Sequence, residues 1–220
     1  MRKKQYVVVG LGRFGSSISK ELIKLGHEVL GIDLDEEIVN EMSSQLTHTV
    51  VADATDEDVL KSLGIRNFDC AVVAIGDDIQ SSILTAIVLK DLGVGQVVAK
   101  ALSELHGKVL TKLGVDRVVY PERDMGIRVA HQLNMPNLLD YIEISKDYTI
   151  VELSVPKRLC GFTIQQLDPR AKYGCSVVAI NKQSGIIIAP TAGDVVNESD
   201  VLVIIGTNGQ IDEFESQVIG

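Results

Sequence analysis

Three glycines stand close together near the start of the chain, in the stretch VVVGLGRFG that covers residues 7–15. Gly10, Gly12 and Gly15 follow a run of valines and precede an amphipathic segment, so the pattern predicts a turn from a strand into a helix. In such a turn the first glycine permits the sharp bend, the second lets the backbone approach a phosphate, and the third permits close packing of helix and strand. The chemistry that this loop indicates is the binding of phosphate groups at a helix N-terminus.

An acid at the expected distance supports a nucleotide site. Asp33 stands 18 residues after Gly15 and ends the second predicted strand, where a carboxylate accepts hydrogen bonds from ribose hydroxyls. Glycines at these intervals also occur in ordinary turns that bind nothing. The strand, the helix and the acid together favour the binding site over that alternative.

Arg13 bears on which nucleotide the loop would hold. It stands between Gly12 and Gly15, where a guanidinium can reach past a pyrophosphate to additional negative charge. A dinucleotide such as NAD(H) needs little cationic help beyond the loop itself, so Arg13 favours a ligand with more phosphate groups. The alternative is a solvated arginine at a helix start.

Further polar groups follow other predicted strands, in ADAT (52–55), AIGDD (74–78), Lys100 and YPERD (120–124). The carboxyl ends of parallel strands share one sheet edge, where ligands of open parallel sheets bind. Taken singly, Asp53, Thr55, Asp77 and Asp78 are expected to cap the helices that follow them. Glu122 stands at a predicted helix start, and two roles remain open for it: an interaction with the helix dipole, or binding of a cation linked to phosphate.

The elements that position these residues alternate along the chain. From Gln5 to about Asn134, six short apolar strands each lead into a helical pattern, which predicts an α/β fold with a Rossmann-like, doubly wound parallel sheet. The segment from Phe14 to Leu25 has helical spacing, and Gly26 stands where a helix C-terminal glycine is expected.

The pattern changes in the last third of the chain, where hairpin-like strands and a final helix predict a small α+β domain. We therefore expect a nucleotide-binding domain over residues 1–134, a connection over 135–144 and a second domain over 145–220.

Composition excludes several classes of function. The formal net charge of −9 argues against binding to a nucleic acid polymer or an anionic bilayer. The apolar run near the start is too short for a signal peptide, and no run of about 18 apolar residues occurs, so a cytoplasmic protein is expected. Cys70, Cys160 and Cys175 are widely spaced and are expected to be reduced thiols.

No catalytic constellation accompanies the glycine loop. All four histidines, His27, His48, His106 and His131, precede residue 145, and no metal-spaced cluster or nucleophile arrangement is evident. We expect a sensor rather than an enzyme, with a ligand that shifts a conformational equilibrium. The alternatives are a small NAD(P)-dependent oxidoreductase or an NAD(H) redox sensor. A transcription factor is disfavoured, because no basic helix-turn-helix segment is present.

The second domain offers one candidate site. Arg170 and Lys172 are expected in a turn beside apolar Ile164, Leu167 and Ala171, and Pro190 ends a neighbouring strand. This combination could hold a small anionic ligand with flat bases. An ordinary basic loop over a small core is the alternative.

Four stretches together resemble a known family: GLGRFG, AIGDDIQSSILTAIVLKDLG, GVDRVVYPERDMGIRVA and LDPRAKYG. With the two-domain layout, they make the chain similar to KtrA/TrkA-type regulators of bacterial potassium uptake, which are built from RCK (KTN) domains. The resemblance covers essentially the whole chain. It implies a Rossmann-like domain that binds ATP or ADP, sometimes NAD(H), and a C-terminal TrkA-C domain. It also implies homodimers that assemble into a ring, commonly octameric, at the inner face of the membrane beneath a membrane subunit that carries K⁺.

The same resemblance implies roles for individual residues. Lys100 would lie near the phosphates, and Glu122 would help to coordinate Mg²⁺ or another divalent cation there. The implied nucleotide-binding residues are Gly10, Leu11, Gly12, Arg13, Phe14, Gly15, Asp33, Asp53, Ala54, Thr55, Ala74, Ile75, Gly76, Lys100 and Glu122.

For the second domain, the resemblance implies an inhibitory site for cyclic di-AMP, with Arg170 on phosphate and apolar residues against adenine. The implied residues are Ile164, Asp168, Arg170, Ala171, Cys175 and Pro190.

Overall fold

The valine-rich runs of the N-terminal part form a six-stranded parallel sheet in the computed structural model, which describes residues 2–220. The spatial order is β3-β2-β1-β4-β5-β6. The strands are β1 (Gln5–Val9), β2 (Glu28–Asp33), β3 (His48–Val51), β4 (Cys70–Val73), β5 (Val97–Lys100) and β6 (Arg117–Val119). This order is that of doubly wound nucleotide-binding folds, with the switch point between β1 and β4. The predicted Rossmann-like α/β fold is confirmed.

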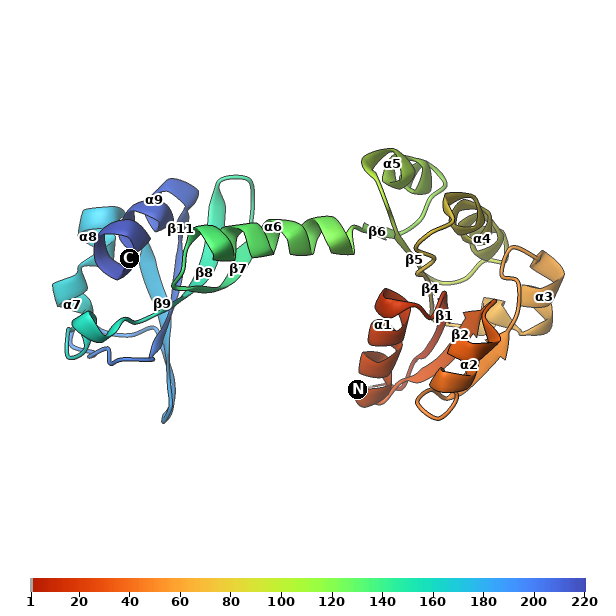
Figure 1. Cartoon of the computed structure of the whole chain (residues 1–220), viewed down its shortest axis with the longest axis horizontal. Helices are drawn as coiled ribbons and strands as arrows, with labels where there is room; N and C mark the ends of the chain where they lie inside the picture. Colours follow the sequence, from red (N-terminus) through yellow and green to blue (C-terminus); the bar gives the residue numbers. More distant parts are fainter. Residues whose placement is uncertain (1) are drawn as a thin grey trace. The chain divides into compact units, whose positions relative to one another are not determined.

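Both faces of this sheet are buried, because successive side chains of a strand point to opposite faces. Val7 and Val9 of β1 belong to the core under three helices, whereas Val8 belongs to the core under two others. The helices are α1 (Arg13–Lys24), α2 (Glu36–Met42), α3 (Glu57–Ser62), α4 (Ile79–Asp91) and α5 (Glu104–Lys112). Helices α3, α4 and α5 cover one face, and α1 and α2 cover the other (Figure 1). No helix among residues 2–220 is both long and apolar enough to cross a membrane.

Helix α1 ends as its sequence predicts. Gly26 has a φ of +86°, and its N–H donates to the carbonyl of Ile23 at 2.9 Å, while the next N–H, that of His27, donates to Leu22 at 3.0 Å. Glycine adopts this left-handed conformation without steric cost, and the two bonds satisfy carbonyls at the helix end.

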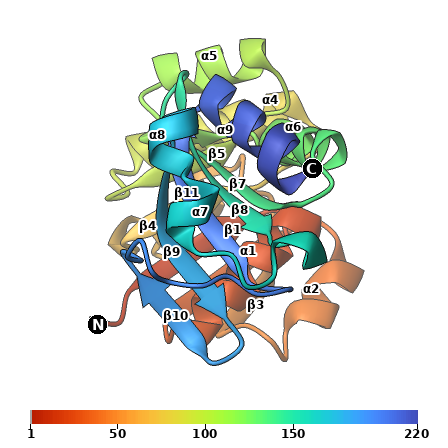
Figure 2. The same cartoon turned by 90° about the vertical axis from the view of Figure 1, so that its left-hand side faces the viewer.

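The division into two structural units falls between Glu122 and Arg123. The second unit contains a five-stranded antiparallel sheet in the order β10-β9-β11-β8-β7, and α8 and α9 pack on it (Figure 2). Its elements are α6 (Pro121–Asn134, whose first residues precede the division), β7 (Leu138–Glu143), β8 (Tyr148–Ser154), α7 (Ile164–Leu167), α8 (Pro169–Tyr173), β9 (Ser176–Lys182), β10 (Gly185–Ile188), β11 (Val201–Thr207) and α9 (Asn208–Phe214). The predicted small α+β domain is confirmed as a fold; the domain limits at residues 134 and 145 stay a prediction.

The segment that the sequence predicts to be a connection, residues 135–144, contains the strand β7. Leu138 is buried, and β7 pairs with β8 along the edge of the second sheet. Polar contacts also hold β7 to α6: Arg128 forms an ion pair with Asp140 at 2.7 Å, and the ring of His131 stacks on Tyr141 with centroids 4.3 Å apart. The second unit therefore incorporates this segment rather than merely following it.

Asp116 ties β5 to the turn before β6 in the first unit. Its Oδ2 accepts hydrogen bonds from the backbone N–H of Val97 at 2.7 Å and from Nζ of Lys90 at 3.2 Å. These contacts hold the pKa of Asp116 below its usual value, and the hydrogen bond from the Val97 N–H is the largest cause.

We expect Asp116→Ala to lower the free energy of unfolding at neutral pH by about 1–2 kcal/mol, because the Val97 N–H loses its acceptor. Since the folded-state pKa is lowered, this stabilisation is present above the unfolded-state pKa of about 3.9 and is lost as the pH falls through the folded-state pKa. Urea unfolding at pH about 7 and about 3 should therefore show a smaller difference between variant and wild type at the lower pH. Asp91→Ala, at the exposed end of α4, is the control, and an equal loss at both pH values for Asp116→Ala would contradict the assignment.

Candidate functional site

The glycine loop joins β1 to α1 with no spare room at two of its three glycines. Gly10 has a φ of +89°, and its N–H donates to the carbonyl of Ile32 at 2.8 Å. A Cβ on Gly15 would lie 1.8 Å from the carbonyl oxygen of Gly10, whereas a Cβ on Gly12 would meet nothing within 4 Å. The first and third glycines therefore fix the turn, and the second borders open space.

Helix α1 begins at this open space. Its N-cap residue is Gly12, which offers no side-chain acceptor, and its first turn carries no acid. The first N–H groups of a helix have no partner within the helix and carry partial positive charge. The start of α1 thus has the chemistry of an anion-binding end.

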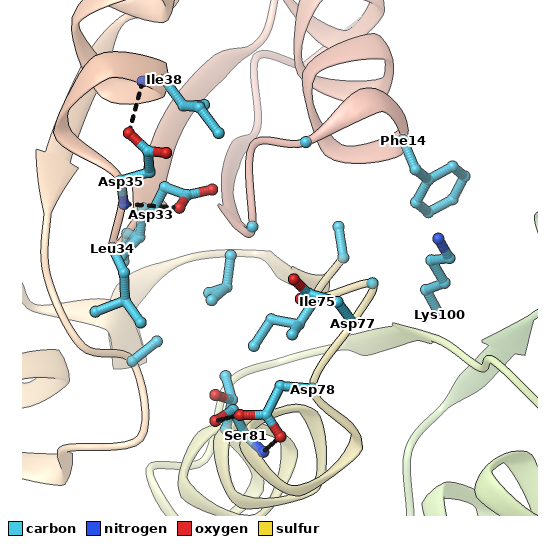
Figure 3. A pocket seen from close by; sticks show the side chains of 18 of the residues that line it. Phe14, Asp33, Leu34, Asp35, Ile38, Ile75, Asp77, Asp78, Ser81 and Lys100 are labelled. Carbon is cyan, nitrogen blue, oxygen red and sulfur yellow. Dashed lines mark hydrogen bonds between the residues drawn. The ribbon is translucent and has the colours of Figure 1, made fainter.

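A cavity of about 560 Å³ lies against this helix start and along the carboxyl ends of the strands (Figure 3). Pockets for small-molecule ligands usually measure about 300–1,000 Å³. The structure brings most of the predicted nucleotide residues to this cavity; those in its lining are Gly10, Gly12, Arg13, Phe14, Asp33, Asp53, Ala54, Thr55, Ala74, Ile75, Gly76, Lys100 and Glu122. Leu11 and Gly15 are not among them, because Leu11 is buried in the core and Gly15 packs against Gly10.

Several lining residues were not predicted as ligand contacts. Leu34, Asp35 and Ile38 follow the end of β2, and Ser81 and Thr85 belong to the first turns of α4. The residues after β2 could have been predicted in the same way as Asp33, because ligands of parallel sheets bind at the carboxyl ends of the strands. The hydroxyl of Thr85 is buried without a hydrogen-bond partner among the described residues, which no sequence pattern signals.

Asp33 is bound to the glycine loop. Its Oδ2 accepts a hydrogen bond from the N–H of Leu11 at 2.6 Å, and its Oδ1 accepts one from the N–H of Asp35 at 3.0 Å. Each carboxylate oxygen has a second lone pair, so the acid can hold the loop and still accept from a ribose hydroxyl. Leu11 therefore contributes its backbone N–H to the position of the acid, although its side chain is in the core.

Lys100 ends β5 and lies across the cavity from Asp33 (Figure 3). Its Nζ forms an ion pair with Oε1 of Glu122 at 2.7 Å and stands 5.9 Å from the centre of the Phe14 ring. Hydrogen bonding from Lys100 is the first cause that holds the pKa of Glu122 below its usual value. Asp33 and Lys100 thus lie on opposite sides of the same cavity.

Arg13 is exposed at the first position of α1 and lines the cavity. Its charge also contributes to the lowered pKa of Glu122. Arg13 and Lys100 thus both line the cavity, and both favour the ionised carboxylate of Glu122.

The helix caps correct part of the sequence interpretation. Asp78 caps α4, because its side chain accepts from the N–H of Ser81 at 3.1 Å, as expected. The cap of α3, however, is Asp56, so the expectation that Asp53 or Thr55 caps it is wrong. Asp53 instead accepts from the hydroxyl of Thr55 at 2.7 Å and from its N–H at 2.9 Å, and these contacts lower the pKa of Asp53.

No group of three or more His, Cys, Asp and Glu side chains in residues 2–220 is arranged to hold a metal ion. Glu122 is the predicted cation ligand, and its side chain is 68% exposed while it pairs with Lys100. A cation at this place would draw its other ligands from bound phosphate oxygens or water, which are the ligands that Mg²⁺ usually keeps.

The three cysteines in the described chain have free thiols, as predicted. Cys70 and Cys175 are buried, which raises the pKa of each thiol to about 11. Cys160 is exposed.

The candidate residues of the second unit occupy two short helices and a strand end. Arg170 and Lys172 are exposed on α8 rather than in a turn, and Asp168, between α7 and α8, has a φ of +46°. The start of α7 is bonded to the segment that follows Pro190, since the N–H of Ile164 donates to the carbonyl of Asp194 at 2.9 Å.

The remaining two candidates of the second unit differ in exposure. Ala171 is exposed on α8, whereas Cys175 is fully buried in the core, where its thiol donates weakly to the carbonyl of Pro169 at 3.6 Å. Of the six residues predicted for this site, Cys175 is thus the one whose side chain is not accessible at the surface.

Two family models match the chain. Residues 6–121 match the TrkA-N domain, and residues 148–218 match the TrkA-C domain. Over 217 residues, the chain is 48% identical to "Ktr system potassium uptake protein C" of Bacillus subtilis (strain 168). The aligned residues cover 99% of this chain and 98% of the relative. It is 33% identical to "Ktr system potassium uptake protein A" of Vibrio alginolyticus, with 94% of each chain covered.

Solved structures share the fold. The chain superposes on the structure described as "GsuK Channel" with a TM-score of 0.72 at 20% identity, covering 100% of this chain and 40% of that one. For "GsuK channel bound to NAD" the TM-score is 0.68 at 19% identity, with the same coverage. The chain thus spans less than half of these neighbours, and at this identity the likeness concerns the fold alone.

Proposed function

The chain belongs to the family of Ktr/TrkA-type potassium uptake proteins with TrkA-N and TrkA-C domains, and we propose that its first unit binds ATP and ADP to regulate a membrane-bound potassium transporter. The observation that carries this proposal is the cavity at the β1–β4 switch point. It joins a glycine loop, a ribose-type acid in Asp33 and two cations in Arg13 and Lys100. Nothing in this proposal requires a bond to break, and the regulator is not an enzyme.

The position of Lys100 across the cavity from Asp33 supports discrimination between nucleotides by their number of phosphates. Asp33 would take the ribose, the start of α1 and Lys100 would take the first phosphates, and Arg13 would take the terminal one. ATP and ADP differ only at that last position, so a state of the protein that engages the terminal phosphate is favoured by the difference in binding free energy. Glu122 would hold Mg²⁺ or another divalent cation beside the same phosphate.

Arg13→Ala is expected to reduce the preference for ATP over ADP by about 5- to 150-fold, because the guanidinium is assigned to the group that distinguishes them. Isothermal titration of both nucleotides in Mg²⁺ measures the two affinities. Arg66→Ala, an exposed arginine of the same unit outside the cavity lining, is the matched control. If the ratio of affinities is the same in Arg13→Ala and wild type, Arg13 does not read the terminal phosphate.

NAD(H) is the competing ligand. The glycine loop and Asp33 would serve it equally well, and a structural neighbour is described as bound to NAD. Titration with NADH, followed by a search for hydride transfer to carbonyl compounds, separates the two: tight NADH binding with turnover would favour the oxidoreductase.

We also propose the assembly and the partner that the family implies: homodimers in an octameric ring, held at the inner face of the membrane by a K⁺-translocating subunit. The relatives named as Ktr system proteins support this. The native mass of the purified chain and its co-purification with a membrane subunit test the two statements.

Cyclic di-AMP is the proposed inhibitor at the second unit. Exposed Arg170 would contact its phosphates, and Ile164, Ala171 and Pro190 would contact its bases. Asp168 and Cys175 would contribute through the backbone turn on either side of α8. A titration with cyclic di-AMP that gives neither saturable heat nor a thermal shift would remove this part of the proposal.

A further inference from the structure

Lys100 lies where three elements of the first unit meet. Its side chain is 8% exposed, and its Nζ is 2.7 Å from Glu122 Oε1. The ring of Phe14, from α1, lies 5.9 Å from the same Nζ, and a Cβ on Gly76, after β4, would lie 3.3 Å from it. The ammonium group is thus held in place by its surroundings.

The two partners of this ion pair differ strongly in exposure. The side chain of Glu122 is 68% exposed, against 8% for that of Lys100. A buried ammonium group needs an anionic partner, because an unpaired buried charge is costly. An exposed carboxylate can return to water at little cost, since exposed ion pairs contribute little. If a second anion reached Lys100, Glu122 would therefore be the group to leave.

The charges that line the cavity favour such a competition. Six acids line it, and the cations in its lining are Arg13 and Lys100. The acids are Asp33, Asp35, Asp53, Asp77, Asp78 and Glu122. A phosphate group that enters this excess of negative charge is attracted to these two cations as well as to the start of α1, and Lys100 is already paired with Glu122.

We propose that Lys100 exchanges partners: it pairs with Glu122 in the free protein and with a nucleotide phosphate in the bound one. When no divalent cation is bound, Glu122 is therefore a positioning residue that competes with the ligand and lowers its affinity. Glu122 is also the last residue of the first unit and lies in the first turn of α6, which continues into the second unit. The exchange releases a carboxylate at the covalent link between the units each time phosphate binds. This inference rests on the proposed nucleotide function and specifies how its site is regulated.

Glu122→Gln in the full chain tests the exchange, with adenosine and ADP titrated calorimetrically in EDTA so that no divalent cation contributes. The variant should bind ADP at least about fivefold more tightly than wild type, because Lys100 no longer has to leave a carboxylate. Adenosine has no phosphate, so its affinity should not change. In a Lys100→Met background, Glu122→Gln should bring no gain. Asp77→Asn removes one negative charge from the same cavity without touching Lys100 and controls for the general field.

The outcomes are distinct. Equal or weaker ADP binding by Glu122→Gln, or an equal gain in Asp77→Asn, overturns the exchange while the nucleotide site stands. If wild type binds neither ADP nor ATP, the proposed function itself fails. Thermal melting of each variant shows whether it is folded at the titration temperature.

Discussion

Gly15→Ala is expected to destabilise the first unit by more than about 4 kcal/mol, an exceptional loss for one methyl group. The added Cβ would lie 1.8 Å from the carbonyl oxygen of Gly10, which is backbone and cannot swing aside. It would also lie 3.1 Å from the side chain of Ala74 at the end of β4. The loop and α1 must separate to accept it, which breaks the packing of α1 on the sheet. Denaturant unfolding followed by circular dichroism measures the loss.

Gly12→Ala is the matched control. It adds the same methyl group three residues earlier, where nothing lies within 4 Å and the φ of −61° suits alanine. Its free energy of unfolding should stay within about 0.5 kcal/mol of wild type. Because that methyl group projects into the space assigned to phosphate, this stable variant should still bind ADP more weakly. Equal stability of the two alanine variants would contradict the described packing of the loop.

Asp33→Asn should weaken ADP binding by about 10- to 150-fold, since hydrogen bonds to a charged acceptor contribute about 1.5–3 kcal/mol. The amide nitrogen replaces one of the two oxygens that accept hydrogen bonds from the N–H groups of Leu11 and Asp35. The loop and the ribose then compete for the one side-chain oxygen that remains. Calorimetric titration measures the affinity.

A change of ligand supplies the control for this variant. Wild type should prefer ADP to 2′,3′-dideoxy-ADP, and Asp33→Asn should lose most of that preference. If the preference is the same in both proteins, Asp33 supports the loop without contacting ribose.

The first unit could be predicted from sequence because its information is local. Runs such as Val7 to Val9 are apolar at every position, which is what a strand buried on both faces requires. Gly10 and Gly15 are required by contacts within one turn, so their spacing is itself the signal.

Sequence patterns carry less information where a distant contact decides. Strand β7 is defined by its pairing with β8 at the edge of the second sheet. An edge strand tolerates polar residues, and Asp140 and Glu143 interrupt the alternation of apolar and polar residues by which a strand is recognised in a sequence. Asp56, rather than Asp53, caps α3, and both are aspartates within one short segment, so composition could not separate them. The pairing of Lys100 with Glu122 joins residues far apart in the sequence, and its burial is visible only in the fold.

The second unit shows the same limit at its candidate site. Arg170 and Lys172 were expected in a turn, but the start of α8 at Pro169 places them on a short helix. Cys175 follows Gly174, which adopts a φ of +73° and turns the chain from α8 into β9, so that the thiol enters the core. A sequence pattern determines neither the placement of Arg170 and Lys172 on a helix nor the burial of the Cys175 thiol, because both depend on the packing of α8 against α9 and β9.

The central claim is that the cavity between Asp33 and the Lys100–Glu122 pair binds an adenine nucleotide and reads its phosphates. The most direct test is one calorimetric series on the wild-type chain in Mg²⁺, with adenosine, ADP and ATP as ligands. We expect saturable binding of one nucleotide per chain, with affinity rising from adenosine to ADP to ATP. No saturable binding, or the same affinity for all three ligands, would contradict it.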